Sequence, residues 1–166
     1  MFKTIEDFRK SWDYEAEMTG KALLNLTDES LNHKVTDDGR TLGFLGWHLA
    51  VTLHEMLGLV GLTIDAPAPE TECPTSAAEI ARIYSIGGKS VGDEVTKNWT
   101  AETLLIEDEM YGETWSRGTT LFCLILHQTH HRGQMTVLMR QVGLRVPGIY
   151  GPAKEEWAAF GQEPLL

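Results

Sequence analysis

The sequence predicts an all-α protein, a four-helix bundle followed by a short helix near the C-terminus. Two observations carry this prediction. Four long segments repeat their apolar residues at helical spacing, and no run of residues alternates convincingly between apolar and polar as strands of a sheet do. Because 166 residues is a usual length for one domain, we expect a single helical domain over 1–166.

The first two helices have recognisable starts. Thr4 can cap the first helix with its hydroxyl, and Thr41 can cap the second, over about 42–62. Between them, the Asp38-Gly39 pair is typical of a turn. One face of the first helix carries Ile5, Phe8, Trp12, Ala16, Leu23 and Leu26. The second helix contains several glycines, so packing against its neighbours must stabilise it.

The second half of the chain predicts two more long helices. Ser76 and Glu79 have capping-box spacing at the start of the third, which we expect to be weak or kinked at Gly87-Gly88. A short strand is expected at 104–106. The fourth helix, about 118–142, ends at Gly143, and a short helix follows near 153–160.

The connections between the long helices each contain a dozen or more residues, whereas a simple up-and-down bundle usually uses about two to eight. We therefore expect at least one crossover connection. Such a connection allows two neighbouring helices to run parallel.

Composition narrows the range of partners. With 24 acidic and 14 basic residues the formal charge is −10, which argues against nucleic acid binding. Two distant cysteines, Cys73 and Cys123, and a start without a signal-peptide core predict a reduced, cytoplasmic protein. The apolar stretch 42–64 is long enough for a membrane span, but ionisable residues near its centre argue for a buried helix, so no membrane association is expected.

The candidate chemistry lies in the fourth helix. His127 and His131 are four residues apart, so both project from one helix face, where two imidazoles can hold one metal ion. A third ligand would be needed. His48 shares its stripe with Leu45, Leu49, Thr52 and Met56, whereas His54 lies about 120° away around the same helix. From spacing alone, a three-histidine metal site and satisfied core histidines both remain open.

Several motifs make the sequence resemble the DinB-like damage-inducible family, which is sometimes grouped with the YfiT-like metal-dependent hydrolases. The resemblance covers nearly the whole chain. It rests on LTDESLN at 26–32, GRTL followed by Trp47-His48, HQTHHRGQ at 127–134 and VGLRVPGIYG at 142–151. It implies up-down-down-up helix connectivity, commonly a homodimer, and one divalent metal held by three histidines. The ligand positions carry over to His48, His127 and His131, none of them substituted.

The resemblance implies a metal-dependent enzyme acting on a small-molecule substrate. Family members include thiol-dependent S-transferases, so S-transfer with a low-molecular-weight thiol cosubstrate ranks above hydrolysis. Zinc or nickel is the expected metal, because imidazole suits both. No general base stands out, so the catalytic group is expected to be a metal-bound water or thiol. The alternative is a non-catalytic, metal-binding stress-response protein.

Other residues receive smaller roles. Gln134, one turn beyond His131, could orient a ligand, although a buried amide bonded to backbone is the preferred interpretation. Arg132 is a candidate to pair with a carboxylate on another helix, and Cys123 is expected to serve packing. The aromatic residues Trp47, Tyr150 and Trp157 are candidates to wall a pocket, with core packing as the commoner role.

Overall fold

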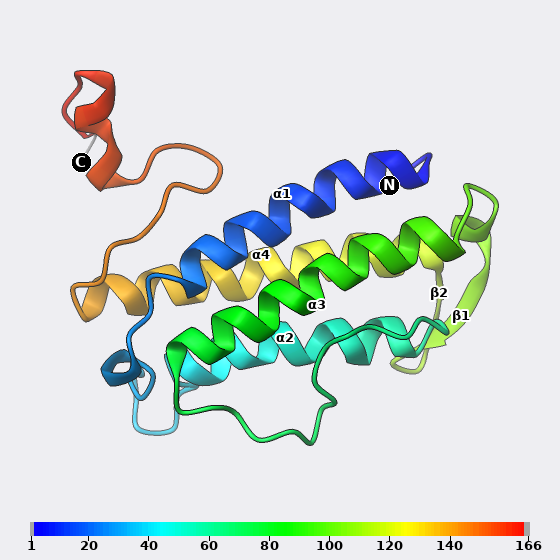
Figure 1. Ribbon diagram of the computed structural model, residues 1–166, viewed down its shortest axis with the longest axis horizontal. Coiled ribbons are helices and arrows are strands. Elements are labelled where there is room, and N and C mark those ends of the chain that lie inside the picture. The colour runs from blue at the N-terminus through cyan, green and yellow to red at the C-terminus, as the bar shows by residue number, and fades with distance from the viewer. Residues whose placement is uncertain (1, 165–166) are drawn as a thin grey trace.

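The computed structural model describes residues 2–164, and four long helices lie side by side in it (Figure 1). Their bounds are Ile5–Leu23 (α1), Leu42–Gly58 (α2), Ala77–Asn98 (α3) and Arg117–Gln141 (α4). Helices α1 and α4 run in one direction, and α2 and α3 run in the other. The all-α bundle with up-down-down-up topology is therefore confirmed. The loop 59–76 is the crossover, because it returns along the bundle and lets α2 and α3 run parallel.

The helix starts follow from capping. The Thr4 and Thr41 hydroxyls accept from the backbone N–H groups of Asp7 and Phe44, as the sequence predicts. Ser76 caps α3 in the same way. Helix α2 ends at Gly58, four residues earlier than expected, and Gly61 adopts a positive φ of 82° just beyond it. The apolar residues after Gly58 belong to the loop, where Val60, Leu62 and Ile64 remain buried.

The region before α4 differs from the expectation. The predicted strand at 104–106 is wrong, because Thr103–Leu105 forms a single 3-10 turn. A hairpin follows it instead, with β1 (Glu107–Met110) paired antiparallel to β2 (Glu113–Ser116). No pattern in the sequence predicts this hairpin, because its strands are four residues each and EDEM and ETWS do not alternate between apolar and polar residues.

The expected kink in α3 does not occur, since the helix runs unbroken through Gly87 and Gly88. Gly87 serves close packing instead. A Cβ atom at that position would lie 3.0 Å from both Ala66 Cβ and Leu53 Cδ1. The absence of a side chain therefore lets α3 approach α2 and the crossover loop.

Each long helix packs against two others: α1 against α3 and α4, and α2 against the same pair. Trp12 of α1 is completely buried and donates its indole N–H to the Gly88 carbonyl of α3 at 2.7 Å. The contact between α2 and α4 brings together the two helices that carry the candidate ligands. The expected short C-terminal helix is a 3-10 helix, Lys154–Phe160, which lies away from the bundle (Figure 1).

Within residues 2–164, no helix combines the length and the hydropathy needed to cross a membrane.

Candidate metal centre

Three histidines from two helices meet between α2 and α4. His48 comes from α2, and His127 and His131 come from successive turns of α4. Each offers one ring nitrogen, and these three atoms all lie within 4.8 Å of one another. No other group of three or more His, Cys, Asp or Glu side chains in the described part of the chain has this spacing. His54, one and a half turns further along α2, lies outside the group.

The distance between two of the ring nitrogens fits one ion. The Nε2 atoms of His48 and His127 are 3.1 Å apart. Two imidazole nitrogens bound to one ion at about 2.1 Å, with an angle of about 90 to 109°, would be about 3.0 to 3.4 Å apart. Without a metal, only one of these two atoms can satisfy the other, by an N–H···N bond. A cation would satisfy the lone pairs of all three rings at once.

Burial keeps the three rings neutral. Burial and, to a smaller extent, the positive charge of Arg40 and of neighbouring histidines lower the pKa of His48 and of His127 to about 4. Burial also lowers the pKa of His131. Neutral imidazole is the form that binds metal, so at neutral pH these rings need not lose a proton first.

Gln134 holds the orientation of His131. Its Oε1 lies 2.8 Å from His131 Nδ1, which places the proton on Nδ1 and leaves the Nε2 lone pair free. The Gln134 amide nitrogen lies 3.2 Å from His130 Nε2. The preferred interpretation of Gln134 as a buried amide bonded to backbone is therefore wrong, because its side chain is exposed and contacts two histidines.

Gln128 has the role that the sequence analysis gave to Gln134. It is completely buried, donates to the Leu49 carbonyl of α2 at 3.1 Å, and accepts from the Tyr84 hydroxyl of α3 at 2.9 Å. These bonds fix α4 beside α2 one residue after His127. Sequence spacing offered a signal, since Gln128 and Leu124 share the buried face of α4.

Arg132 holds α4 against α1. Its guanidinium is 2.7 Å from the Glu15 carboxylate of α1, and both side chains are buried. It also donates to Thr19 Oγ1 at 3.0 Å and to the Tyr150 hydroxyl at 2.8 Å. The suggested pairing of Arg132 with a carboxylate across helices is confirmed. Because Arg132 follows His131 directly, this anchor also sets how α4 is rotated about its axis.

A cavity of about 370 Å³ is lined by Gln134, the partner of His131, and by none of the three histidines themselves. None of the aromatic candidates lines it. Trp47 is buried and donates to the Thr71 carbonyl at 3.0 Å, and Tyr150 belongs to the Arg132 network. Cys123 packs against the core, and burial raises the pKa of its thiol, so a packing role fits it.

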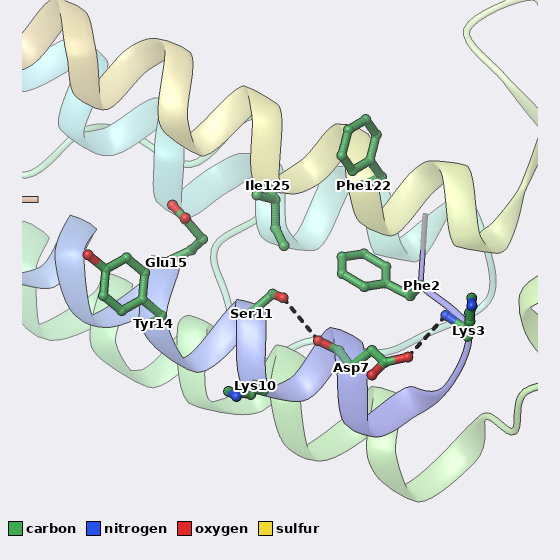
Figure 2. A pocket seen from close by; sticks show the side chains of 9 residues that line it. All are labelled: Phe2, Lys3, Asp7, Lys10, Ser11, Tyr14, Glu15, Phe122 and Ile125. Atoms are coloured by element: carbon green, nitrogen blue, oxygen red, sulfur yellow. Dashed lines mark hydrogen bonds between the residues drawn. The ribbon is translucent and has the colours of Figure 1, made fainter. Parts of the chain in front are cut away.

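A second cavity, about 790 Å³, lies between α1 and α4 and contains none of the three histidines. Figure 2 shows Phe2 and Ile125 pointing into this space, with Phe122 beside them on α4. It is an open groove in which Asp7 and Lys3 lie close to the apolar side chain of Phe2.

The fold and the site define a class of helical-bundle proteins with a three-histidine cluster between two helices. The chain belongs to the DinB family, whose sequence model matches residues 1–165. It is 47% identical over 163 residues to the uncharacterized protein YrdA of Bacillus subtilis (strain 168), with 98% of each chain covered.

Solved structures agree with this assignment. A DinB-like protein from Bacillus cereus ATCC 10987 is 41% identical, with a TM-score of 0.86 over 90% of this chain and 100% of that one. YjoA, a DinB-like protein of Bacillus subtilis, has a TM-score of 0.68 at 14% identity, over 89% of this chain and 99% of that one. The second likeness concerns the fold alone.

Proposed function

We propose that this protein is a metal-dependent enzyme that holds one divalent transition metal with His48, His127 and His131. The observation that carries the proposal is the convergence of three neutral ring nitrogens from α2 and α4 beside a cavity. Three protein ligands are typical of catalytic zinc sites, whereas structural sites are closed by four. Zinc and nickel are both compatible with an all-imidazole ligand set.

The bound metal would supply a positive charge that lowers the pKa of a thiol or a water molecule next to it. The chain's own residues supply the rest. Gln134 holds His131 in the tautomer that presents Nε2, and the Arg132–Glu15 pair holds α4 in place. The walls of the adjoining cavity offer apolar contacts to a bound molecule.

We rank an S-transferase reaction, in which the sulfur of a small thiol attacks an electrophilic substrate, ahead of hydrolysis. The lining of the cavity contains no carboxylate that could accept a proton. A thiol with a pKa of about 8.5 needs far less acidification than water at about 15.7 to lose its proton at neutral pH. In the transfer, sulfur forms a bond to an electrophilic carbon, the leaving group departs with its electron pair, and the thiol proton passes to solvent.

A thiol screen tests this proposal. The metal-loaded protein is mixed with several low-molecular-weight thiols and monochlorobimane, and the fluorescent thioether is measured. We expect turnover with at least one thiol, lost in His127→Ala and kept in His54→Ala, which changes a histidine of α2 outside the group. Metal binding without turnover of any thiol would support the alternative, a non-catalytic metal-binding protein of the stress response. Turnover that survives in metal-free protein would overturn the proposal.

We also propose that the protein is a homodimer. Exposed apolar side chains support it: Phe122 and Leu126 are exposed and lie one turn apart on α4, and Phe122 lines the groove in Figure 2. Burial of such a surface against a second copy would remove it from water.

A further inference from the structure

The cavity beside the histidines is apolar except at two positions. Three segments line it: Val35, Gly39 and Arg40 from the loop after α1, Leu45 from α2, and Gln134, Val137 and Leu138 from α4. Gln134 and Arg40 are its polar groups. The cavity therefore combines space for an apolar group with one positive charge.

Two lining residues connect this cavity to the histidine group. Gln134 lines it and contacts His131 at 2.8 Å. Arg40 lines it and lies over the Phe44 ring, which stacks on His48. A molecule that filled the cavity would therefore contact the residues that touch two of the three rings.

Arg40 has no carboxylate partner in the described part of the chain. Five of the seven arginines make ion pairs there, and Arg40 and Arg145 do not. The Arg40 guanidinium instead lies over the Phe44 ring, 5.1 Å from its centroid. Phe44 stacks in turn on His48, with centroids 5.7 Å apart and planes at 14°. Because stacking uses the face of the guanidinium, its N–H edges stay available to an anion.

The loop that carries Arg40 is held at both ends. His33 Nε2 lies 3.1 Å from Gln141 Oε1 at the end of α4, and the Leu42 N–H donates to the His33 carbonyl at 2.9 Å. Inside the loop, the Gly39 N–H donates to the Thr36 carbonyl at 2.9 Å. The position of Arg40 is thus set before any ligand arrives, which lowers the entropic cost of binding.

We propose that this cavity binds the substrate as a small molecule with an apolar part and one anionic group, and that Arg40 binds the anionic group. The inference rests on the proposed function only in calling this molecule the substrate. A chain with a formal charge of −10 repels anions in general, so an anionic ligand needs a dedicated cation. A carboxylate or sulfonate can accept two N–H bonds from the guanidinium fork.

Two probes with the same aromatic rings separate charge from apolar contact. The metal-free protein is titrated with 1-anilinonaphthalene-8-sulfonate, an anion, and with the neutral N-phenyl-1-naphthylamine, and probe fluorescence is measured. We expect Arg40→Gln to weaken binding of the sulfonate about five- to tenfold, with binding of the neutral amine unchanged. Arg145→Gln removes the other unpaired arginine and should change neither probe.

A third variant places the probes in the cavity. Val137→Asn makes one apolar wall polar and should weaken both probes. Equal sulfonate binding by wild type and Arg40→Gln, or binding of both probes unaffected by Val137→Asn, would overturn the inference. Because these titrations need no metal, the two proposals can fail separately. If the protein binds no metal but still prefers the sulfonate in an Arg40-dependent way, the proposed metal-dependent enzyme is refuted and the anion site stands. If the protein turns over thiols but shows no such preference, the anion site is refuted and the enzyme stands.

Discussion

At the residue scale, His131 meets two conditions that a metal-ligating imidazole requires. Burial keeps its ring neutral, and Gln134 occupies Nδ1 so that Nε2 is free. His48 and His127 are more strongly affected by burial, and their Nε2 atoms face one another at 3.1 Å. All three rings are therefore kept neutral, but His131 is oriented by a glutamine whereas His48 and His127 contact each other.

Removal of a single ligand should release the metal. We expect wild-type protein to carry about one metal per chain, and His127→Ala and His131→Ala to carry almost none, because two imidazoles bind a divalent ion far more weakly than three. Elemental analysis of the purified proteins measures this. His54→Ala should keep full occupancy. Normal occupancy in either ligand variant would refute the assignment.

Loss of the Gln134 side chain should weaken the site without abolishing it. Outer groups that orient a ligating histidine typically contribute about 10- to 100-fold in metal affinity. We expect Gln134→Ala to bind zinc weaker by about that factor in a competition titration with a chromophoric chelator, with an unchanged circular dichroism spectrum. Val137→Ala, a change at another exposed position of α4, should leave the affinity near wild type. Equal affinity in Gln134→Ala and wild type would mean that the contact with His131 does not support the site.

At the scale of elements, buried polar bonds hold α4 between α1 and α2. Arg132 bonds to Glu15 and Thr19 of α1, and Gln128 bonds to the Leu49 carbonyl of α2. The Arg132–Glu15 pair leaves side-chain exposures of 1% and 8%, whereas the Arg82–Glu79 pair on α3 leaves 59% and 41%. Desolvation makes the first pair costly to break, since either partner alone would be a buried, unpaired charge.

We therefore expect Arg132→Met to lower the free energy of unfolding by about 3 to 5 kcal/mol, because it strands the Glu15 carboxylate. Urea denaturation measures the loss. Arg82→Met breaks an exposed pair and should cost less than about 1 kcal/mol. The double variant Glu15→Leu with Arg132→Met should recover part of the stability, since no unpaired charge remains. Similar losses for Arg132→Met and Arg82→Met would contradict this account.

At the scale of the whole molecule, the outer surface of α4 bears on assembly. Leu126 is 49% exposed, and Phe122, which lines the groove in Figure 2, is 40% exposed. We expect light scattering to give twice the chain mass of 18.5 kDa for the wild type, and the single mass for Leu126→Glu. Leu105→Glu places the same charge on another exposed leucine and should stay dimeric. A monomeric wild type would refute the dimer, and a dimeric Leu126→Glu would refute this interface.

Local interactions let the sequence by itself determine the four helices and their starts. Capping by Thr4 and Thr41 involves residues three apart, and the i, i+4 spacing of His127 and His131 fixes their common face. The apolar stripe of the second helix favoured His48 over His54, and the family resemblance supplied the ligand role of His48 and the up-down-down-up order. Spacing alone left the triad open, because it cannot say which helices become neighbours.

Tertiary structure decided what depends on contacts between distant segments. Three features follow from packing that no local sequence pattern predicts. Helix α2 ends at Gly58, and α3 runs straight through Gly87. Gln128 is the buried amide bonded to backbone, whereas Gln134 contacts His131. The hairpin before α4 forms although only one of its strand residues, Met110, is buried. The same holds for Arg40, an ordinary loop arginine in the sequence, which the fold places beside an apolar cavity and near the histidines. Its position depends on bonds between residues more than a hundred apart, such as that between His33 and Gln141.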